Sequence, residues 1–227
     1  MIPLKDDNPT SGRPIVTYFL IGMCVVIFFV QLGSESYRTG QLFYSYGLIP
    51  SVLMGHDQLP INLYVVPAYV TIFSSMFMHG GWMHLIGNMW YMKIFADNIE
   101  DNLGSRNFII FYILCGIGAA MAQVLMDTHS QVPMVGASGA IGGVLGAYLI
   151  NHPNARVLVL IPYIIITIIK IRALYVLGFW FILQFISSGG GIAYAAHIGG
   201  FVSGMILILF FNKKMKRRTK VIKGPWS

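Results

Sequence analysis

The chain has 227 residues, 56% of them hydrophobic and 10% charged, with a mean hydropathy of +0.69. Soluble domains carry about 25% charged residues, so this composition excludes a soluble globular protein and indicates a polytopic membrane protein. The net charge of +7 does not indicate nucleic-acid binding, because seven of the fifteen basic residues lie in one C-terminal tail after an apolar segment. Such a tail is typical of a cytoplasmic end in contact with anionic membrane lipid.

Apolar segments that cross or nearly cross a bilayer recur six times along the chain. A crossing helix needs about 20 residues. We expect spans at 14–32, 82–95, 108–126, 137–151, 173–186 and 192–211. The predicted fold is an all-α polytopic membrane protein, a bundle of six transmembrane helices. Its predicted parts are a cytoplasmic N-terminal lead (1–13), the six-span domain (14–211) and a basic cytoplasmic tail (212–227).

The segments between the spans differ in character. Residues 33–81 are interrupted by three prolines, so we expect an outer-face loop that lies partly in the membrane interface. The polar stretch 97–107 is expected to turn the chain, and 187–191 to form a flexible turn. Residues 157–169 contain Pro162 and are too short to cross a bilayer as a helix, so we expect an interfacial, partly extended connector.

The basic residues predict the orientation of the chain. Six spans place both termini on the same side of the membrane, and the opposite loops contain only Arg38. Cytoplasmic loops carry an excess of Lys and Arg, so we expect both termini to be cytoplasmic. The residues on the predicted cytoplasmic side, besides the tail, are Lys5, Arg13, Arg106, Arg156, Lys170 and Arg172.

Four polar residues lie at a similar shallow depth below the predicted outer face. Ser138 begins the fourth span within a Gly-Ala-Ser-Gly sequence, His197 lies near the start of the sixth, and His84 and Asn88 lie in the first turns of the second. Polar groups at this depth are costly unless they face one another or a water-filled cavity. We therefore expect the four side chains to converge.

Glycine spacing supports this convergence. Ser138 shares a helix face with glycines four and eight residues later, and His197 with glycines three and seven residues later. Small residues let two helices approach closely, which a serine–histidine hydrogen bond of about 2.6–3.2 Å requires. None of the eight acidic residues lies inside a predicted span. We therefore expect a dyad, with Ser138 as nucleophile and His197 as general base and then general acid.

The start of the fourth span also offers hydrogen-bond donors for an oxyanion. The first N–H groups of a helix are unpaired and lie at the positive end of its dipole. The Ser138 N–H, His84 and Asn88 are therefore the predicted oxyanion hole. An alternative is a metal site formed by His79, His84 and His197, but no Asp, Glu or Cys lies near them in the predicted topology. We expect no metal and no cofactor.

Three sequence motifs together resemble the rhomboid family of intramembrane serine proteases. They are HGGWMHLIGN (79–88), GASGA (136–140) and AHIGGFVSG (196–204), within a resemblance that covers about residues 14–211. The resemblance implies a six-helix rhomboid-like bundle that cleaves single-pass transmembrane protein substrates near the outer face of the membrane. It implies the same nucleophile, base and oxyanion donors. The expected location is a bacterial cytoplasmic membrane.

One departure from the family pattern leaves the support of His197 open. Many rhomboid proteases carry an aromatic residue four positions after the serine, where this chain has Gly142. Two rival functions are a small six-span transporter and an inactive rhomboid-like binding protein. Transporters usually show internal repeats, none of which is visible here. An inactive relative would be expected to have lost Ser138 or His197, and both are present.

Overall fold

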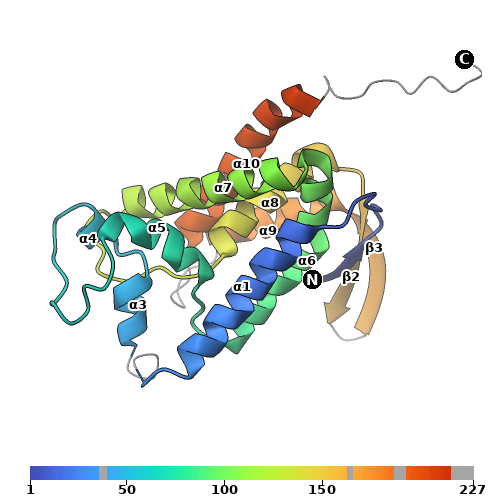
Figure 1. Ribbon diagram of the computed structural model, residues 1–227. Helices are drawn as coiled ribbons and strands as arrows, with labels where there is room; N and C mark the ends of the chain where they lie inside the picture. The colour runs from blue at the N-terminus through green and yellow to red at the C-terminus, as the bar shows by residue number, and fades with distance from the viewer. Residues whose placement is uncertain (36–39, 163–165, 187–192, 216–227) are drawn as a thin grey trace, which may run out of the picture.

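The computed structural model describes residues 1–35, 40–162, 166–186 and 193–215. Six helices match the six predicted spans and form a bundle, with a small sheet at one end and short helices at the other (Figure 1). They are α1 (Ile15–Leu32), α6 (Trp82–Leu103), α7 (Ser105–Met126), α8 (Ser138–Asn151), α9 (Ala173–Ile186) and α10 (Tyr194–Met215). The mostly helical membrane bundle expected from the sequence is confirmed.

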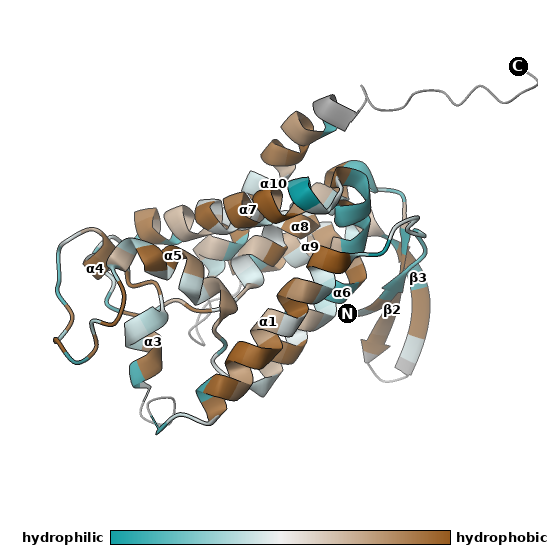
Figure 2. Cartoon of the chain, in the orientation of Figure 1, coloured by the Kyte–Doolittle hydropathy of each residue, from teal (hydrophilic) through white to brown (hydrophobic). Residues whose placement is uncertain are grey.

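The apolar surface of the bundle is that of an integral membrane protein. Among the described residues, three helices are long and apolar enough to cross a membrane, namely α1, α7 and α10, while α8 and α9 are apolar but shorter. Figure 2 shows these apolar helices in brown and the more polar ends of the molecule in teal. Many large apolar side chains on the helices are exposed, for example Val30, Leu125 and Phe185.

Helix α8 is the centre of the bundle. Its residues from Gly139 to Tyr148 are all buried, and it packs against α6, α7, α9 and α10. A helix that is surrounded in this way must be apolar on every side. Its 14 residues span about 21 Å, less than the roughly 30 Å of the hydrocarbon core. One end of α8 therefore lies below the membrane surface.

Glycines bring the backbones of α8 and α10 into direct contact. A Cβ atom on Gly204 of α10 would lie 1.9 Å from the carbonyl oxygen of Gly143 in α8. A Cβ atom on Gly200 would lie equally close, 1.9 Å, to the carbonyl oxygen of Gly139. Any side chain at either α10 position would push the two helices apart.

The expected turn over 97–107 was wrong at its start. Helix α6 continues to Leu103, and Gly104 makes the turn with a φ of 72°. Asn98 and Glu100 are buried in the last turns of α6 although both are polar. The polarity of this stretch indicates a loop, but the side chains of Asn98 and Glu100 instead form hydrogen bonds with neighbouring segments of the chain.

Glu100 joins the ends of three helices. Its carboxylate accepts hydrogen bonds from the backbone N–H groups of Val16 (2.9 Å) and Thr17 (2.8 Å), and from the hydroxyl of Ser105 (2.6 Å). The first N–H groups of a helix have no partner within the helix. Glu100 therefore caps α1 from α6 and also contacts the first residue of α7.

Of the predicted partly extended connector 157–169, the described residues form two regular β-strands, and 163–165 lie outside the described residues. Strands β2 (Arg156–Pro162) and β3 (Ile166–Arg172) pair antiparallel. Strand β1 (Ile2–Asp6), from the N-terminal lead, pairs antiparallel with the other edge of β2 and completes a sheet of order β1-β2-β3. The predicted all-α fold did not include this sheet, which lies at one end of the helical bundle (Figure 1).

The described residues of the segment before α6 contain only short pieces of helix, which agrees with the prediction that this segment does not cross the membrane. These pieces are α3 (Gln41–Tyr46), α4 (Pro50–Leu53), the 3-10 helix η1 (Ala68–Val70), α5 (Thr71–Ser74) and the 3-10 helix η2 (Ser75–Phe77). Arg38, the expected turn at 187–191 and the tail from residue 216 lie outside the described residues.

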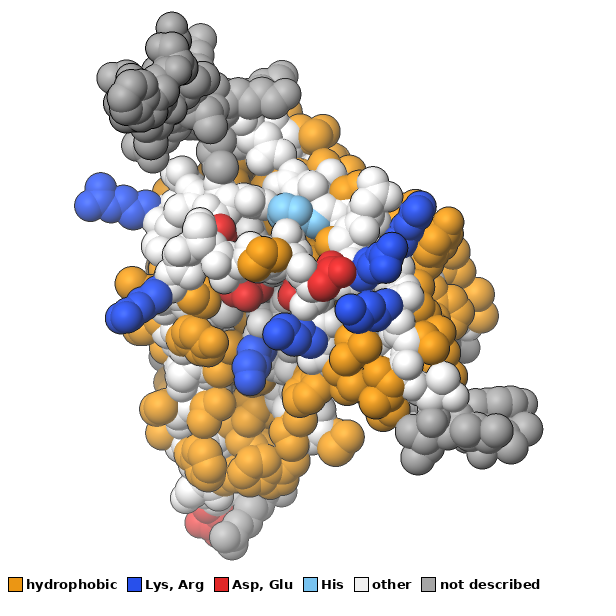
Figure 3. Space-filling model, turned by 90° about the vertical axis from the view of Figure 1, so that its right-hand side faces the viewer, with side chains coloured by type: hydrophobic (Ala, Val, Ile, Leu, Met, Phe, Trp, Pro, Cys, Tyr) orange, Lys and Arg blue, Asp and Glu red, His pale blue; other side chains and the backbone are white. Residues whose placement is uncertain are grey.

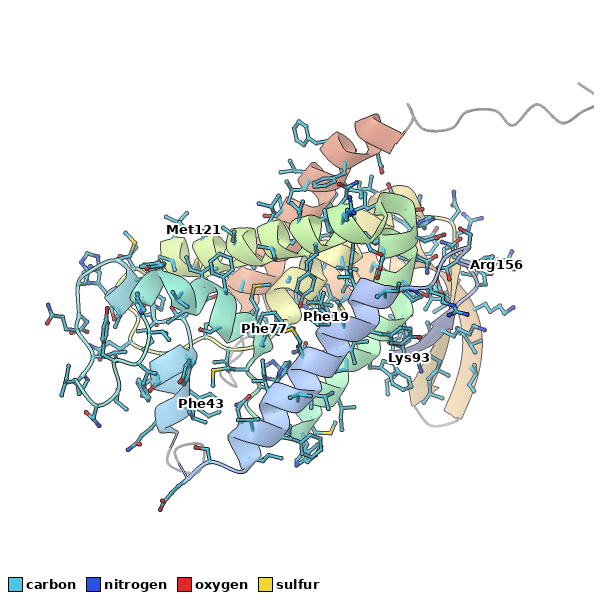
Figure 4. All side chains as sticks on the ribbon, in the orientation of Figure 1. Phe19, Phe43, Phe77, Lys93, Met121 and Arg156 are labelled. Carbon is cyan, nitrogen blue, oxygen red and sulfur yellow. The ribbon has the colours of Figure 1, made fainter. Side chains whose placement is uncertain are left out.

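Exposed cations gather at the sheet end of the molecule. Figure 3 views this end and shows Lys and Arg side chains around a smaller group of acidic ones, and Figure 4 labels Lys93 and Arg156 there. The acidic side chains accept hydrogen bonds from the chain itself: Asp6 from Tyr148 (2.6 Å), and Asp101 from the backbone N–H of Gly12 (2.9 Å). Burial raises the pKa of the Asp6 carboxyl above its usual value.

The first prediction tests the orientation of the bundle. A cysteine that replaces exposed Val132 should react with a membrane-impermeant maleimide added to intact cells. Cysteines at exposed Asn154 and Lys170 should react only after permeabilisation, because they lie at the cation-rich end. Cys24 and Cys115 are buried and should give little background. The opposite labelling pattern would reverse the predicted topology.

The second prediction tests the contact between α8 and α10. Gly204→Ala should lower the free energy of unfolding by on the order of 3 kcal/mol, because the new methyl group overlaps the Gly143 backbone. Gly178→Ala is the matched control, since a Cβ atom at Gly178 has nothing within 4 Å. It should change stability by no more than about 1 kcal/mol, in the stabilising direction. Thermal unfolding in detergent measures both, and equal behaviour of the two variants would contradict the packing argument.

Candidate active site

A cavity of about 870 Å³ opens beside the buried start of α8. Its lining comes from the five helices α6 to α10, from the segment just before α8, and from α5, η2 and the residues just before α6. All four polar residues selected from the sequence line this one cavity, namely His84, Asn88, Ser138 and His197. The structure therefore brings together the side chains that were expected to converge.

Ser138 is the first residue of α8, and a glycine makes its position possible. Gly136, two residues earlier, has a φ of 126°, in the region that favours glycine. A Cβ atom on Gly136 would lie 2.6 Å from Nε2 of His84. The backbone N–H of Gly136 donates to the carbonyl oxygen of Ser75 at 2.8 Å. The loop is thus anchored on one side and passes directly beside the His84 ring.

Ser138 and His197 form a hydrogen bond. The distance between Ser138 Oγ and His197 Nε2 is 2.8 Å, within the range that a nucleophile–base pair requires. The contact of α8 with α10 permits this distance, because the two residues lie on helices whose backbones touch. The other ring nitrogen of His197 lies 2.7 Å from Oε1 of Gln184.

Gln184 of α9 is a site residue that the sequence analysis missed. It is the one amide side chain in an otherwise apolar or aromatic helix, and polar residues within a membrane span tend to be functional. That signal was available in the sequence. An aromatic side chain does contact the His197 ring, but it comes from α9 and not from position 142. Trp180, one turn before Gln184, lies with its ring centroid 5.8 Å from that of His197.

His84 and Asn88 lie one turn apart on α6 and face the same cavity. The backbone N–H of Gly80 donates to Nδ1 of His84 at 3.4 Å, which leaves the ring proton of neutral His84 on Nε2, beside Gly136. Asn88 is only 8% exposed, and its Nδ2 has no hydrogen-bond partner among the described residues. A buried donor without a partner is uncommon and is suited to an acceptor that arrives with a ligand.

His79 lies behind this pair and does not line the cavity. It is fully buried, its ring contacts the His84 ring edge-on at 5.2 Å, and its Nδ1 lies 3.3 Å from the carbonyl oxygen of Phe77. Its backbone N–H and C=O both bind the Gln31 side chain of α1. Within the described part of the chain, no three His, Cys, Asp or Glu side chains are placed to hold a metal ion.

The sequence is similar to those of known proteins. The family model for the Rhomboid domain matches residues 66–214. The chain is 28% identical over 213 residues to the putative rhomboid protease YdcA of Bacillus subtilis, covering 90% of this chain and 92% of that protein. It is 29% identical over 197 residues to the rhomboid protease GluP of the same organism, covering 86% of this chain. RHOMBOID-like protein 5 of Arabidopsis thaliana is 33% identical over 78 residues, 34% of this chain.

The lengths of these relatives differ. The matched region is 25% of the Arabidopsis protein and 34% of GluP, so the chain spans about a quarter to a third of their lengths. The Rhomboid domain match nevertheless covers well over half of this chain and includes all four polar residues of the cavity. The chain belongs to the rhomboid family.

Proposed function

We propose that the protein is an intramembrane serine endopeptidase that cleaves single-pass transmembrane proteins near the outer membrane face. The observation that carries the proposal is the 2.8 Å hydrogen bond between Ser138 Oγ and His197 Nε2 inside a cavity of a membrane bundle. The family assignment and relatives named as rhomboid proteases support it. The proposed setting is a bacterial cytoplasmic membrane with both termini in the cytoplasm.

In the first half of the reaction, Ser138 Oγ attacks the carbonyl carbon of the scissile peptide bond. His197 Nε2 takes the hydroxyl proton as the new C–O bond forms. When the tetrahedral intermediate collapses, the C–N bond breaks and His197 returns the proton to the leaving amine. The products of this half are an acyl-enzyme, in which the N-terminal part of the substrate is esterified to Ser138, and the released C-terminal fragment with its new free amino group.

In the second half, water replaces the amine. His197 removes a proton from the water as its oxygen attacks the acyl carbon, and then protonates Ser138 Oγ as the ester bond breaks. This step needs water at the depth of the serine. The cavity lined by Ser138 and His197 offers the space for that water.

In the proposed mechanism, three donors stabilise the oxyanion of each tetrahedral intermediate. The N–H of Ser138 lies in the first turn of α8, where backbone donors have no helical partner. The Nδ2 of Asn88 is buried and without a partner among the described residues, and His84 presents its Nε2 beside Gly136. Donors that already point at the position of the developing oxyanion stabilise the transition state more than the bound substrate.

The position of the serine supports the proposed substrate class. Ser138 begins a helix that is too short to reach both membrane surfaces, so a scissile bond must reach it at that depth. Apolar side chains also line the cavity, among them Ile72, Met76 and Leu145. A peptide segment from a transmembrane protein matches both the depth and the lining.

The third prediction tests the dyad. Ser138→Ala should lower the rate of cleavage of a transmembrane substrate by on the order of 10⁴-fold or more, with the protein still folded. His197→Ala should be equally inactive, and the double variant no worse than either single one, since the two groups act as a unit. A fluorophosphonate probe should label the wild type and not Ser138→Ala.

Ser51→Ala is the matched control for this experiment. Ser51 is buried, its Oγ has no partner among the described residues, and it does not line the cavity. The Ser51→Ala variant should label and cleave as the wild type does. Cleavage near the wild-type level in folded Ser138→Ala would reject Ser138 as the nucleophile and, with it, the proposed function.

The fourth prediction tests the oxyanion hole against the metal alternative. Asn88→Ala should lower kcat about 100- to 1,000-fold with a smaller change in KM, because the lost donor acts in the transition state. Asn102→Ala, on the same helix but bonded to His152 far from the cavity, should leave kcat unchanged. Chelators should have no effect. Activity that chelation removes and added zinc restores would instead favour a metal mechanism.

A further inference from the structure

Gln184 makes two hydrogen bonds that link α9 to the dyad. Its Nε2 donates to the backbone carbonyl oxygen of Trp180 at 2.8 Å, and its Oε1 lies 2.7 Å from Nδ1 of His197. The side chain is 9% exposed. It lies on the side of the imidazole opposite Ser138, because the serine contacts the other ring nitrogen.

The direction of these hydrogen bonds is determined by the Trp180 carbonyl. A carbonyl oxygen only accepts, so the NH₂ group of Gln184 must face it and the amide oxygen must face His197. An amide oxygen also only accepts, so Nδ1 of His197 must carry a proton. In the neutral imidazole Nε2 then has a free lone pair, and it faces the Ser138 hydroxyl at 2.8 Å.

The reversed amide would have the opposite effect. Turning the Gln184 side chain over would place its oxygen against the Trp180 oxygen and its NH₂ against Nδ1 of His197. Neutral His197 would then carry its proton on Nε2 and could not accept the serine proton. The carbonyl of Trp180 therefore selects the tautomer of His197 that can act as a base.

We propose that Gln184 is the positioning residue of the dyad, in the place where a triad has a carboxylate. The inference rests on the proposed function of Ser138 and His197. Gln184 does not contact the reacting atoms, and it acts by holding the imidazole in one tautomer and one orientation. A general base must lie within hydrogen-bond reach of the proton that it takes, with its accepting nitrogen free.

The aromatic support of His197 comes from the same helix. The Trp180 ring is tilted by 33° to the His197 ring and stacks on Phe201 at 6.0 Å, and Phe201 in turn stacks on Phe181 at 4.5 Å. A Cβ atom on Gly142 would lie 3.7 Å from the Trp180 ring and 3.0 Å from the His197 carbonyl oxygen. Gly142 thus leaves room for α9 to supply both the ring contact and the amide.

An amide orients the histidine without compensating its charge. During the reaction His197 becomes an imidazolium, and a carboxylate partner would stabilise that cation more than a neutral amide does. The pH dependence of the reaction is therefore the property that distinguishes an orienting amide from an ordinary packing residue.

The fifth prediction compares two substitutions at Gln184. Gln184→Met keeps the length of the side chain and removes both hydrogen bonds, so kcat should fall about 100-fold with KM within about twofold. Gln184→Glu restores an acceptor for Nδ1 and adds a negative charge. It should retain more activity than Gln184→Met, and the pH at which kcat falls on the acid side should move upward. Fluorophosphonate labelling rates should follow the same order.

Gln123→Met is the matched control. Gln123 of α7 also holds the start of α10, by accepting a hydrogen bond from the Ala196 backbone N–H at 3.2 Å, but its side chain has no bond to the His197 ring. This variant should lose stability and keep the wild-type pH profile. It shows what a purely structural glutamine in this region contributes.

Two outcomes would overturn the inference. One is a wild-type kcat and pH profile in Gln184→Met. The other is an equal loss of kcat in Gln184→Met and Gln184→Glu, with the pH profile of Gln184→Glu unshifted, as for Gln123→Met. If Ser138→Ala is inactive in the same assay, either outcome rejects the role of Gln184 alone. An active Ser138→Ala variant would reject the dyad itself.

Discussion

The contact between the backbones of α8 and α10 is the constraint on which the site depends. Gly204 and Gly143 touch with no side chain between them, and one or two turns away the same two helices hold His197 and Ser138 at hydrogen-bond distance. Each glycine inside a helix costs about 1 kcal/mol in helix propensity. Lipid tails are as apolar as the helices, so the hydrophobic effect does not drive the helices together. The close packing that small residues allow offsets the cost of the glycines.

Side chains from other helices hold the two histidines His197 and His79. Gln184 of α9 holds His197 of α10, and Gln31 of α1 holds the backbone of His79 just before α6. A hydrogen bond in a region of low dielectric is stronger than in water, and an unpaired polar group there is costly. Of the three buried side-chain atoms without a partner among the described residues, Ser51 Oγ, His79 Nε2 and Asn88 Nδ2, only the last belongs to a residue that lines the cavity, which is consistent with the proposed oxyanion hole.

The six spans and the four cavity residues could be predicted because each depends on local properties: apolar length, glycine spacing and depth in the membrane. The sheet could not, since β1 and β2 are paired across more than 150 residues and neither strand alone indicates its partner. The buried end of α6 was missed because Glu100 is charged, and only tertiary structure shows the donors that it meets. Gln184 could have been noticed as the one amide in an apolar helix, but the sequence does not show which residue its side chain faces.

The position of Glu100 has a consequence for the order in which the protein assembles during synthesis. The carboxylate that caps α1 lies 84 residues after Val16 in the chain, so it is made long after α1 itself. Until then the first N–H groups of α1 have only water to bind, and the hydrocarbon core offers none. The start of α1 can therefore receive this cap only after α6 has been made.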